Sequence, residues 1–180
     1  MTTTAGGADT GPEAEAEAQH LKEVRRRRAE LLESITALEQ ALAAPGRQEQ
    51  WAERVSEALS ELSGEFHDHV VLMEGPSGLN VRLTRRFPRL AHEVDGLTKE
   101  HATLTGLIRE LSTLVGQARG SMELGESTQR HESTPDESTP GGWDEVRERG
   151  NKLLGALTRH RQRGADLVYE AYSVDIGGRD

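Results

Sequence analysis

Four stretches of the chain carry apolar residues at alternating spacings of three and four. This spacing puts the apolar side chains on one face of a helix, so each stretch predicts an amphipathic helix with one buried stripe. In chain order the stripes are Leu21, Val24, Leu31, Ile35, Leu38 and Leu42; Val55, Leu59, Leu62, Phe66 and Met73; Leu90, Val94, Leu97, Leu104, Ile108, Leu111 and Val115; and Val146, Leu153, Leu157, Leu167 and Ala171. Four such helices predict an all-α, up-down-up-down antiparallel four-helix bundle.

One basic side chain interrupts each stripe at an interior position. The interruptions are Arg28, His69, His101 and His160. Because they belong to the buried stripes, we expect all four to point into the bundle. Counting residues along each antiparallel hairpin puts them near one level, given a rise of about 1.5 Å per residue. The sequence therefore predicts one polar layer inside an apolar core.

The two halves of the chain are similar enough to be copies of one helical hairpin. A shift of 73 residues places the first stripe on the third and Arg28 on His101. A shift of 91 residues places the second stripe on the fourth and His69 on His160. The two shifts differ because the second half holds an insertion, which a loop tolerates since only its ends are constrained.

Both ends and one internal stretch are expected to lie outside the helices. Residues 1–18, rich in Thr, Gly, Glu and Ala, predict a disordered acidic segment, and residues 19–175 predict the bundle. Within the bundle, residues 116–142 repeat a Glu-Ser-Thr-Pro phrase and predict a disordered loop between the third and fourth helices. Residues 176–180 predict a flexible tail. A short helix or turn is expected at residues 79–87.

Composition narrows the possible functions. A formal net charge of −9 opposes binding to nucleic acid or to an anionic membrane. The chain has no cysteine, so any metal must be held by histidine and carboxylate side chains. Because no apolar run approaches membrane-spanning length and the first residues lack a signal-peptide pattern, we expect a cytoplasmic protein. The sequence has no phosphate-binding loop and no nucleophile motif, so we expect a non-catalytic protein. Its protein partner is unknown.

In these features the chain resembles the hemerythrin-like, or HHE, cation-binding domains. The resemblance covers about residues 20–172 and rests on the bundle pattern, on Glu100-His101 in the third helix, and on the histidines centred in the second and fourth helices. It implies a bundle of two duplicated hairpins whose interior histidines and carboxylates bind iron, with an oxygen- or iron-related sensing or storage role. His69, His101 and His160 match its ligand positions.

The chain departs from the pattern of that family at three positions. Arg28 stands where the family has a histidine in the first helix. Met73 and Gly164 stand four residues after His69 and His160, where the family has carboxylates that bridge two ions. Because bridging carboxylates hold a di-iron pair together, we expect one ion or none.

Two states of the layer follow from these departures, and both involve Glu74, five residues after the histidine of the second helix. In one, His69, Glu74, His101 and His160 bind a single ion, with iron implied by the resemblance, and Arg28 is deflected along the stripe toward solvent. In the other, Arg28 pairs with Glu74 and the histidines form a polar network without metal. The second state predicts a metal-free scaffold or interaction protein.

Overall fold

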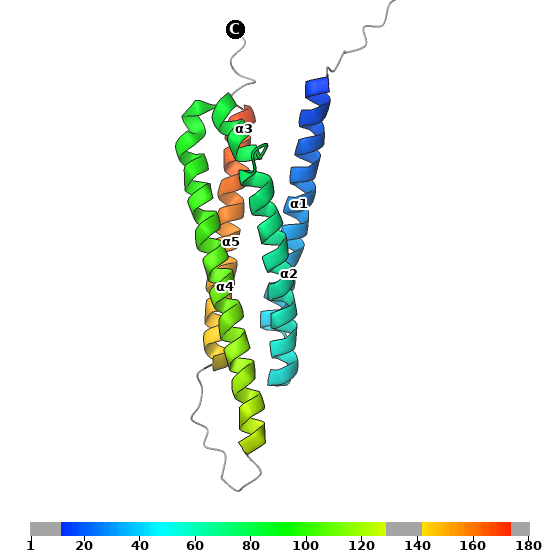
Figure 1. Ribbon diagram of the computed structural model, residues 1–180, viewed down its shortest axis with the longest axis vertical. Helices are drawn as coiled ribbons and strands as arrows, with labels where there is room; N and C mark the ends of the chain where they lie inside the picture. The colour runs from blue at the N-terminus through cyan, green and yellow to red at the C-terminus, as the bar shows by residue number, and fades with distance from the viewer. Residues whose placement is uncertain (1–11, 129–141, 174–180) are drawn as a thin grey trace, which may run out of the picture.

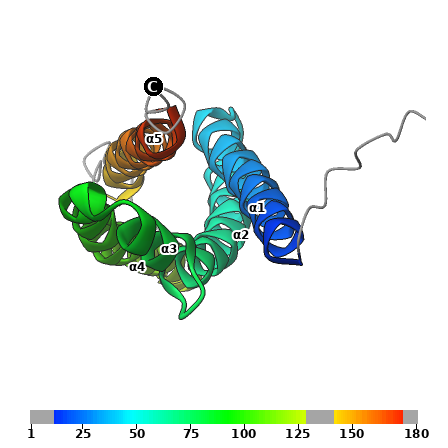
Figure 2. The ribbon, with the colours of Figure 1, turned by 90° about the horizontal axis from the view of Figure 1, so that it is seen from above.

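The computed structural model describes residues 12–128 and 142–173, which are helical apart from short turns (Figure 1). The elements are α1 (Pro12–Ala43), α2 (Gln48–Glu74), α3 (Leu79–Arg86), the 3-10 helix η1 (Pro88–Leu90), α4 (Ala91–Thr128) and α5 (Gly142–Ser173). The four long helices run alternately up and down and surround a common interior, seen end-on in Figure 2. The described residues contain no strand, and the predicted all-α four-helix bundle is confirmed.

Neighbouring helices in the bundle pack along their apolar stripes. α1 packs against α2, α2 against α4, and α4 against α5, while α5 contacts α1 less extensively. The short α3 lies at one end of the bundle, where it contacts α2 and α4 (Figure 1). The predicted short helix at residues 79–87 is therefore present. Among the described residues, no helix is long and apolar enough to cross a membrane.

The apolar core consists of two clusters of buried side chains. The larger is formed by all four long helices and includes Leu38, Trp51, Leu62, Leu111 and Val146. The smaller lies toward α3 and includes Met73, Leu79, Leu90, Leu97 and Leu167. The stripe of each long helix contributes to both clusters, so the polar interruptions fall between the two.

Helices extend into two segments where disorder was expected, the first of which was also a possible acidic extension of the first helix. α1 begins at Pro12, where proline suits a first helical position, and the Glu-Ala alternation that follows is good helix-forming sequence. α4 continues through residues 116–128 of the predicted loop, since Gly116 and Gly120 each weaken a helix by only about 1 kcal/mol. Residues 1–11, 129–141 and 174–180 lie outside the described residues; disorder was also expected there, except at 174 and 175, which the prediction included in the bundle.

Candidate metal centre

Three buried histidines meet in the interior of the bundle. His69 comes from α2, His101 from α4 and His160 from α5, and their exposed fractions are 7%, 2% and 5%. The Nε2 atom of His160 lies 3.1 Å from Nε2 of His101 and 3.5 Å from Nε2 of His69. The three side chains can offer one nitrogen each within 4.8 Å of one another. The prediction that these histidines share one layer is confirmed.

Carboxylates orient two of the three imidazoles from behind. Glu74 Oε1 lies 2.5 Å from Nδ1 of His101, and Glu100 Oε2 lies 2.9 Å from Nδ1 of His160. A carboxylate accepts hydrogen bonds, so Nδ1 of each ring is the donor. The Nε2 atoms of the two rings face each other on the inner side, 3.1 Å apart. A histidine bonded to a carboxylate in this way is a common arrangement of metal ligands.

Apolar side chains surround the imidazole cluster and hold it away from water. The ring of Phe66 lies 5.9 to 6.3 Å, centroid to centroid, from all three imidazoles. Leu157, one turn before His160, and Leu97, one turn before His101, are also buried beside the cluster. The histidines are therefore fixed by packing as well as by hydrogen bonds.

Burial favours the neutral form of His69 and His160. Desolvation lowers the pKa of His69 to about 3, and the charges of His101, His160 and Arg28 act in the same direction. Burial also lowers the pKa of His160, against the opposing effect of its hydrogen bond to Glu100. A neutral imidazole is the form that binds a metal ion, so these rings need lose no proton at neutral pH.

Glu74 lies in a different place from either predicted arrangement. It is the last residue of α2, which keeps regular α-helical geometry to its end. Its carboxylate instead bonds the outer nitrogen of His101, and the group of facing ligand atoms consists of the three histidines. The predicted ion pair between Glu74 and Arg28 does not occur among the described residues, because His101 takes the carboxylate.

Arg28 borders the cluster, as its position in the stripe of α1 predicts. It lines a cavity together with the three histidines and with Arg161 of α5. Burial lowers the pKa of Arg28, and the neighbouring charge of Arg161 lowers it further. The layer thus has a half-buried cation beside its histidines.

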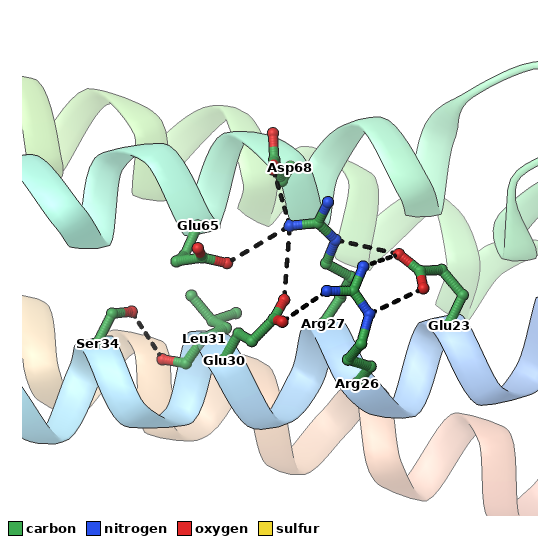
Figure 3. Close-up of polar contacts among 8 residues, drawn as sticks. All are labelled: Glu23, Arg26, Arg27, Glu30, Leu31, Ser34, Glu65 and Asp68. Atoms are coloured by element: carbon green, nitrogen blue, oxygen red, sulfur yellow. Dashed lines mark hydrogen bonds and ion pairs between the residues drawn. The ribbon is translucent and has the colours of Figure 1, made fainter.

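The carboxylates nearest to Arg28 along α1 are held by its two neighbours (Figure 3). Arg26 pairs with Glu23 and Glu30 at 2.5 and 2.7 Å. Arg27 contacts the same two carboxylates and reaches across to α2, where its Nη1 lies 2.9 Å from Asp68 and 3.8 Å from Glu65. This network joins α1 to α2, and Arg28 takes no part in it.

Two residues of the site were not assigned a role from the sequence. Glu100 orients His160 and also pairs with Arg163 at 2.8 Å, and Arg161 lines the cavity. The periodicity of a helix directs Glu100 away from the stripe that contains His101, and only the packing of α4 against α5 brings it to His160. Arg161 directly follows His160 in the chain. Being next to a buried residue does not predict that a side chain lines a cavity.

No protein-family model, curated protein or solved structure matches this chain. The fold and the site alone therefore define its class: an all-α four-helix bundle with three buried histidines that could hold a metal ion.

Proposed function

We propose that this protein is a non-catalytic metal-binding bundle that holds one ion through Nε2 of His69, His101 and His160. The observation that carries the proposal is the convergence of three buried imidazoles, two of which are oriented by carboxylates at Nδ1. Three protein ligands leave a further coordination position open to a small molecule or an anion.

The spacing of the ring nitrogens suits one small ion. Nitrogen ligands lie about 2.0 to 2.1 Å from Zn²⁺, which in a tetrahedral arrangement puts two of them about 3.3 Å apart. The Nε2 atoms of His101 and His160 are 3.1 Å apart, and those of His160 and His69 are 3.5 Å apart. All three nitrogens lie within 4.8 Å of one another, so an ion held by all three would draw His69 and His101 closer together.

The hydrogen-bond directions also favour a cation at the centre. In the tautomers that donate from Nδ1 to the two carboxylates, Nε2 of each ring bears a lone pair, and the two lone pairs face each other. Such an arrangement is repulsive unless a cation lies between the nitrogens. A metal ion satisfies both rings at once and removes the repulsion.

We propose iron as the metal because the resemblance to hemerythrin-like domains includes all three ligand positions. An all-histidine set also accepts zinc and cobalt, so the metal must be tested by comparison. No carboxylate lines the cavity among the described residues, and Met73 and Gly164 cannot bridge two ions. This favours one ion per chain over a di-iron centre, with a sensing or storage role related to iron or oxygen.

Metal titration of the chelator-stripped, untagged protein tests this proposal. Fe²⁺, Zn²⁺ and Co²⁺ are added separately, and stoichiometry is measured by elemental analysis and, for cobalt, by its visible spectrum. The expected result is one ion per chain, lost in His101→Ala and retained in His92→Ala. His92 is the matched control because it is an exposed histidine on the same helix. A folded wild-type protein that binds none of the three ions, or equal binding by His101→Ala, would overturn the proposal.

Glu74→Gln provides a finer test of the same geometry. It keeps the size of the side chain but weakens the hydrogen bond that orients His101. Loss of such an outer partner lowers metal affinity about 10- to 100-fold. An unchanged affinity would show that His101 is not a ligand oriented in this way.

The second candidate is a metal-free scaffold in which the histidines form a hydrogen-bonded network. The 3.1 Å separation between His101 and His160 favours it, because this is also a hydrogen-bond distance. One extra proton, placed between these two rings, would then replace the metal ion. The same titration distinguishes the two states, since the network requires a folded protein that takes up no ion.

A further inference from the structure

A groove of about 450 Å³ lies between the first half of α1 and the last turns of α5, next to α3. Figure 2 shows the first turns of α1 standing apart from the last turns of α5. These two helices also contact each other less extensively than the other neighbouring pairs of long helices. Side chains on the facing surfaces of α1 and α5 are therefore open to a ligand.

Most of the side chains that line the groove are apolar or aromatic. They are Leu21, Val24, Leu79, Val168, Tyr169 and Tyr172. Tyr169 is 75% exposed, so most of its surface is in contact with water. Sites for small organic molecules are lined predominantly by such side chains, with a few polar groups that fix the orientation of the ligand. A hydrocarbon chain lying in the groove would remove this apolar surface from water.

The charged side chains that line the groove are all cationic. They are the exposed Arg25 and the half-buried Arg28, and no aspartate or glutamate lines the groove. Glu23 and Glu30, the nearest acidic residues on α1, are paired with other arginines of that helix (Figure 3). In the part of the chain that the structure describes, no carboxylate forms an ion pair with Arg25 or Arg28. The charge of the groove therefore favours an anionic ligand, although the whole chain is acidic.

The size of the groove favours a small molecule over a helix of another protein. Its volume of about 450 Å³ lies within the range of about 300 to 1,000 Å³ that is usual for small-molecule sites. One turn of a helix, about 10 Å across and about 5.4 Å long, occupies roughly 400 Å³. A docked helix places anchoring side chains over two turns or more, for which this groove is too short.

The surroundings of the groove give the ligand a direction. Val24, Leu79 and Val168 line both the groove and the cavity of about 30 Å³ beside the histidines. That cavity is lined mainly by apolar side chains, so it suits the end of a hydrocarbon chain and not a charged group. Arg25 is exposed and does not line the cavity. An amphipathic ligand would therefore lie with its apolar end inward and its charged end near Arg25.

We propose that this groove binds one molecule of an unbranched alkyl carboxylate of medium chain length. Its hydrocarbon chain lies against the apolar and aromatic lining, and its carboxylate lies at the solvent edge beside Arg25. Arginine suits this position because its guanidinium group donates hydrogen bonds to both oxygens of a carboxylate. The inference is independent of the proposed metal ion, because no histidine lines the groove.

The test is a calorimetric titration of the full-length protein with sodium decanoate, which has ten carbons. A chelator is present throughout, so that the carboxylate cannot bind to a metal ion instead. Octanoate has the same charge and a chain that is two methylenes shorter, and 1-decanol has a ten-carbon chain without the charge. Burial of one methylene changes affinity by about fourfold, so the comparison with octanoate measures how far the chain is buried.

Two variants of lining residues are compared with two matched controls. Tyr169→Ser and Arg25→Gln change exposed side chains, so both proteins should fold. Val71→Ser removes an exposed apolar side chain and Arg159→Gln an exposed arginine, neither of which lines the groove. Light scattering on the same samples measures whether the chain is a monomer or a dimer.

The wild type and both controls should bind one decanoate per chain, with octanoate about tenfold weaker and 1-decanol several-fold weaker. Tyr169→Ser should weaken decanoate binding by about fivefold, and Arg25→Gln by about two- to fivefold, as is usual for an exposed ion pair. Absence of saturable binding by the folded wild type would overturn the proposal, and so would equal affinities in all five proteins. A dimer that Tyr169→Ser dissociates would also overturn it, because a second copy of the chain would then occupy the groove.

Discussion

Replacing His69 by glutamine should make the stability of the metal-free protein less sensitive to acid. His69 is 7% exposed, and burial with its charged neighbours lowers its pKa to about 3 from an ordinary value of 6.5. The unfolded chain therefore binds a proton at this side chain below pH 6.5, whereas the native protein does not until about pH 3. Since the unfolded state binds more protons in this window, the free energy of unfolding must fall as the pH falls.

The size of the effect follows from the width of that window. Each pH unit below 6.5 costs about 1.4 kcal/mol of stability for one histidine that stays neutral when folded. The wild type should therefore lose about 2 kcal/mol at pH 5 through His69 alone. Carboxylates elsewhere also contribute to acid unfolding, but they are common to both proteins and cancel when the variant is compared with the wild type.

Urea unfolding followed by circular dichroism at pH 7, 6 and 5, with a chelator present, measures this difference. His67→Gln is the control, because His67 is an exposed histidine on the same helix. From pH 7 to pH 5, the wild type and His67→Gln should lose about 2 kcal/mol more than His69→Gln. If all three proteins lose the same stability, His69 is not a buried neutral histidine and the description of the site is wrong.

Three further predictions concern the fold. Leu62→Ala should reduce the free energy of unfolding by about 2–5 kcal/mol, because Leu62 is 0% exposed. In the same urea assay, the control Leu32→Ala, at a site that is 39% exposed, should reduce it by less than about 1 kcal/mol. Gly78→Ala should destabilise the protein by about 1–3 kcal/mol, because the added Cβ atom would lie 2.5 Å from the Met73 carbonyl oxygen. Gly116→Ala should stabilise the protein by about 0.5–1 kcal/mol, because Gly116 is helical and an added Cβ atom would meet no other atom within 4 Å. Arg27→Gln should lower the thermal midpoint slightly at low salt, because it removes the ion pair with Asp68. It should have no effect at about 1 M salt, where ions screen a partly exposed pair.

The bundle could be predicted because burial imposes a pattern that is visible in the sequence. Leu38, Leu62 and Val146 lie in the predicted stripes, and each is 0–1% exposed. The helix ends were harder to predict because they depend on small differences in local free energy. α4 passes through Gly116 and Gly120, although two glycines and a polar repeat nearby favoured a loop.

The candidate site could be predicted only in part. The three histidines were identifiable because each replaces an apolar residue in a stripe, and equal counting along the hairpins puts them at one level. Glu74 and Glu100 were not assigned correctly because each orients a histidine on another helix, His101 and His160 respectively. Which carboxylate meets which histidine depends on how neighbouring helices pack. The spacing of residues within one helix contains no information about that packing.

The charge of Arg28 bears on the proposed metal ion. A divalent ion between the histidines would lie near Arg28, which lines the same cavity as the three imidazoles. Two cations disfavour each other, and most strongly where little water screens them. Arg28→Gln should therefore bind the metal more tightly than the wild type in the titration of the chelator-stripped protein. Arg159→Gln is the control, because Arg159 is exposed and does not line the cavity, and it should bind the metal with the wild-type affinity. Equal affinity in all three proteins would show that Arg28 does not act on the bound ion.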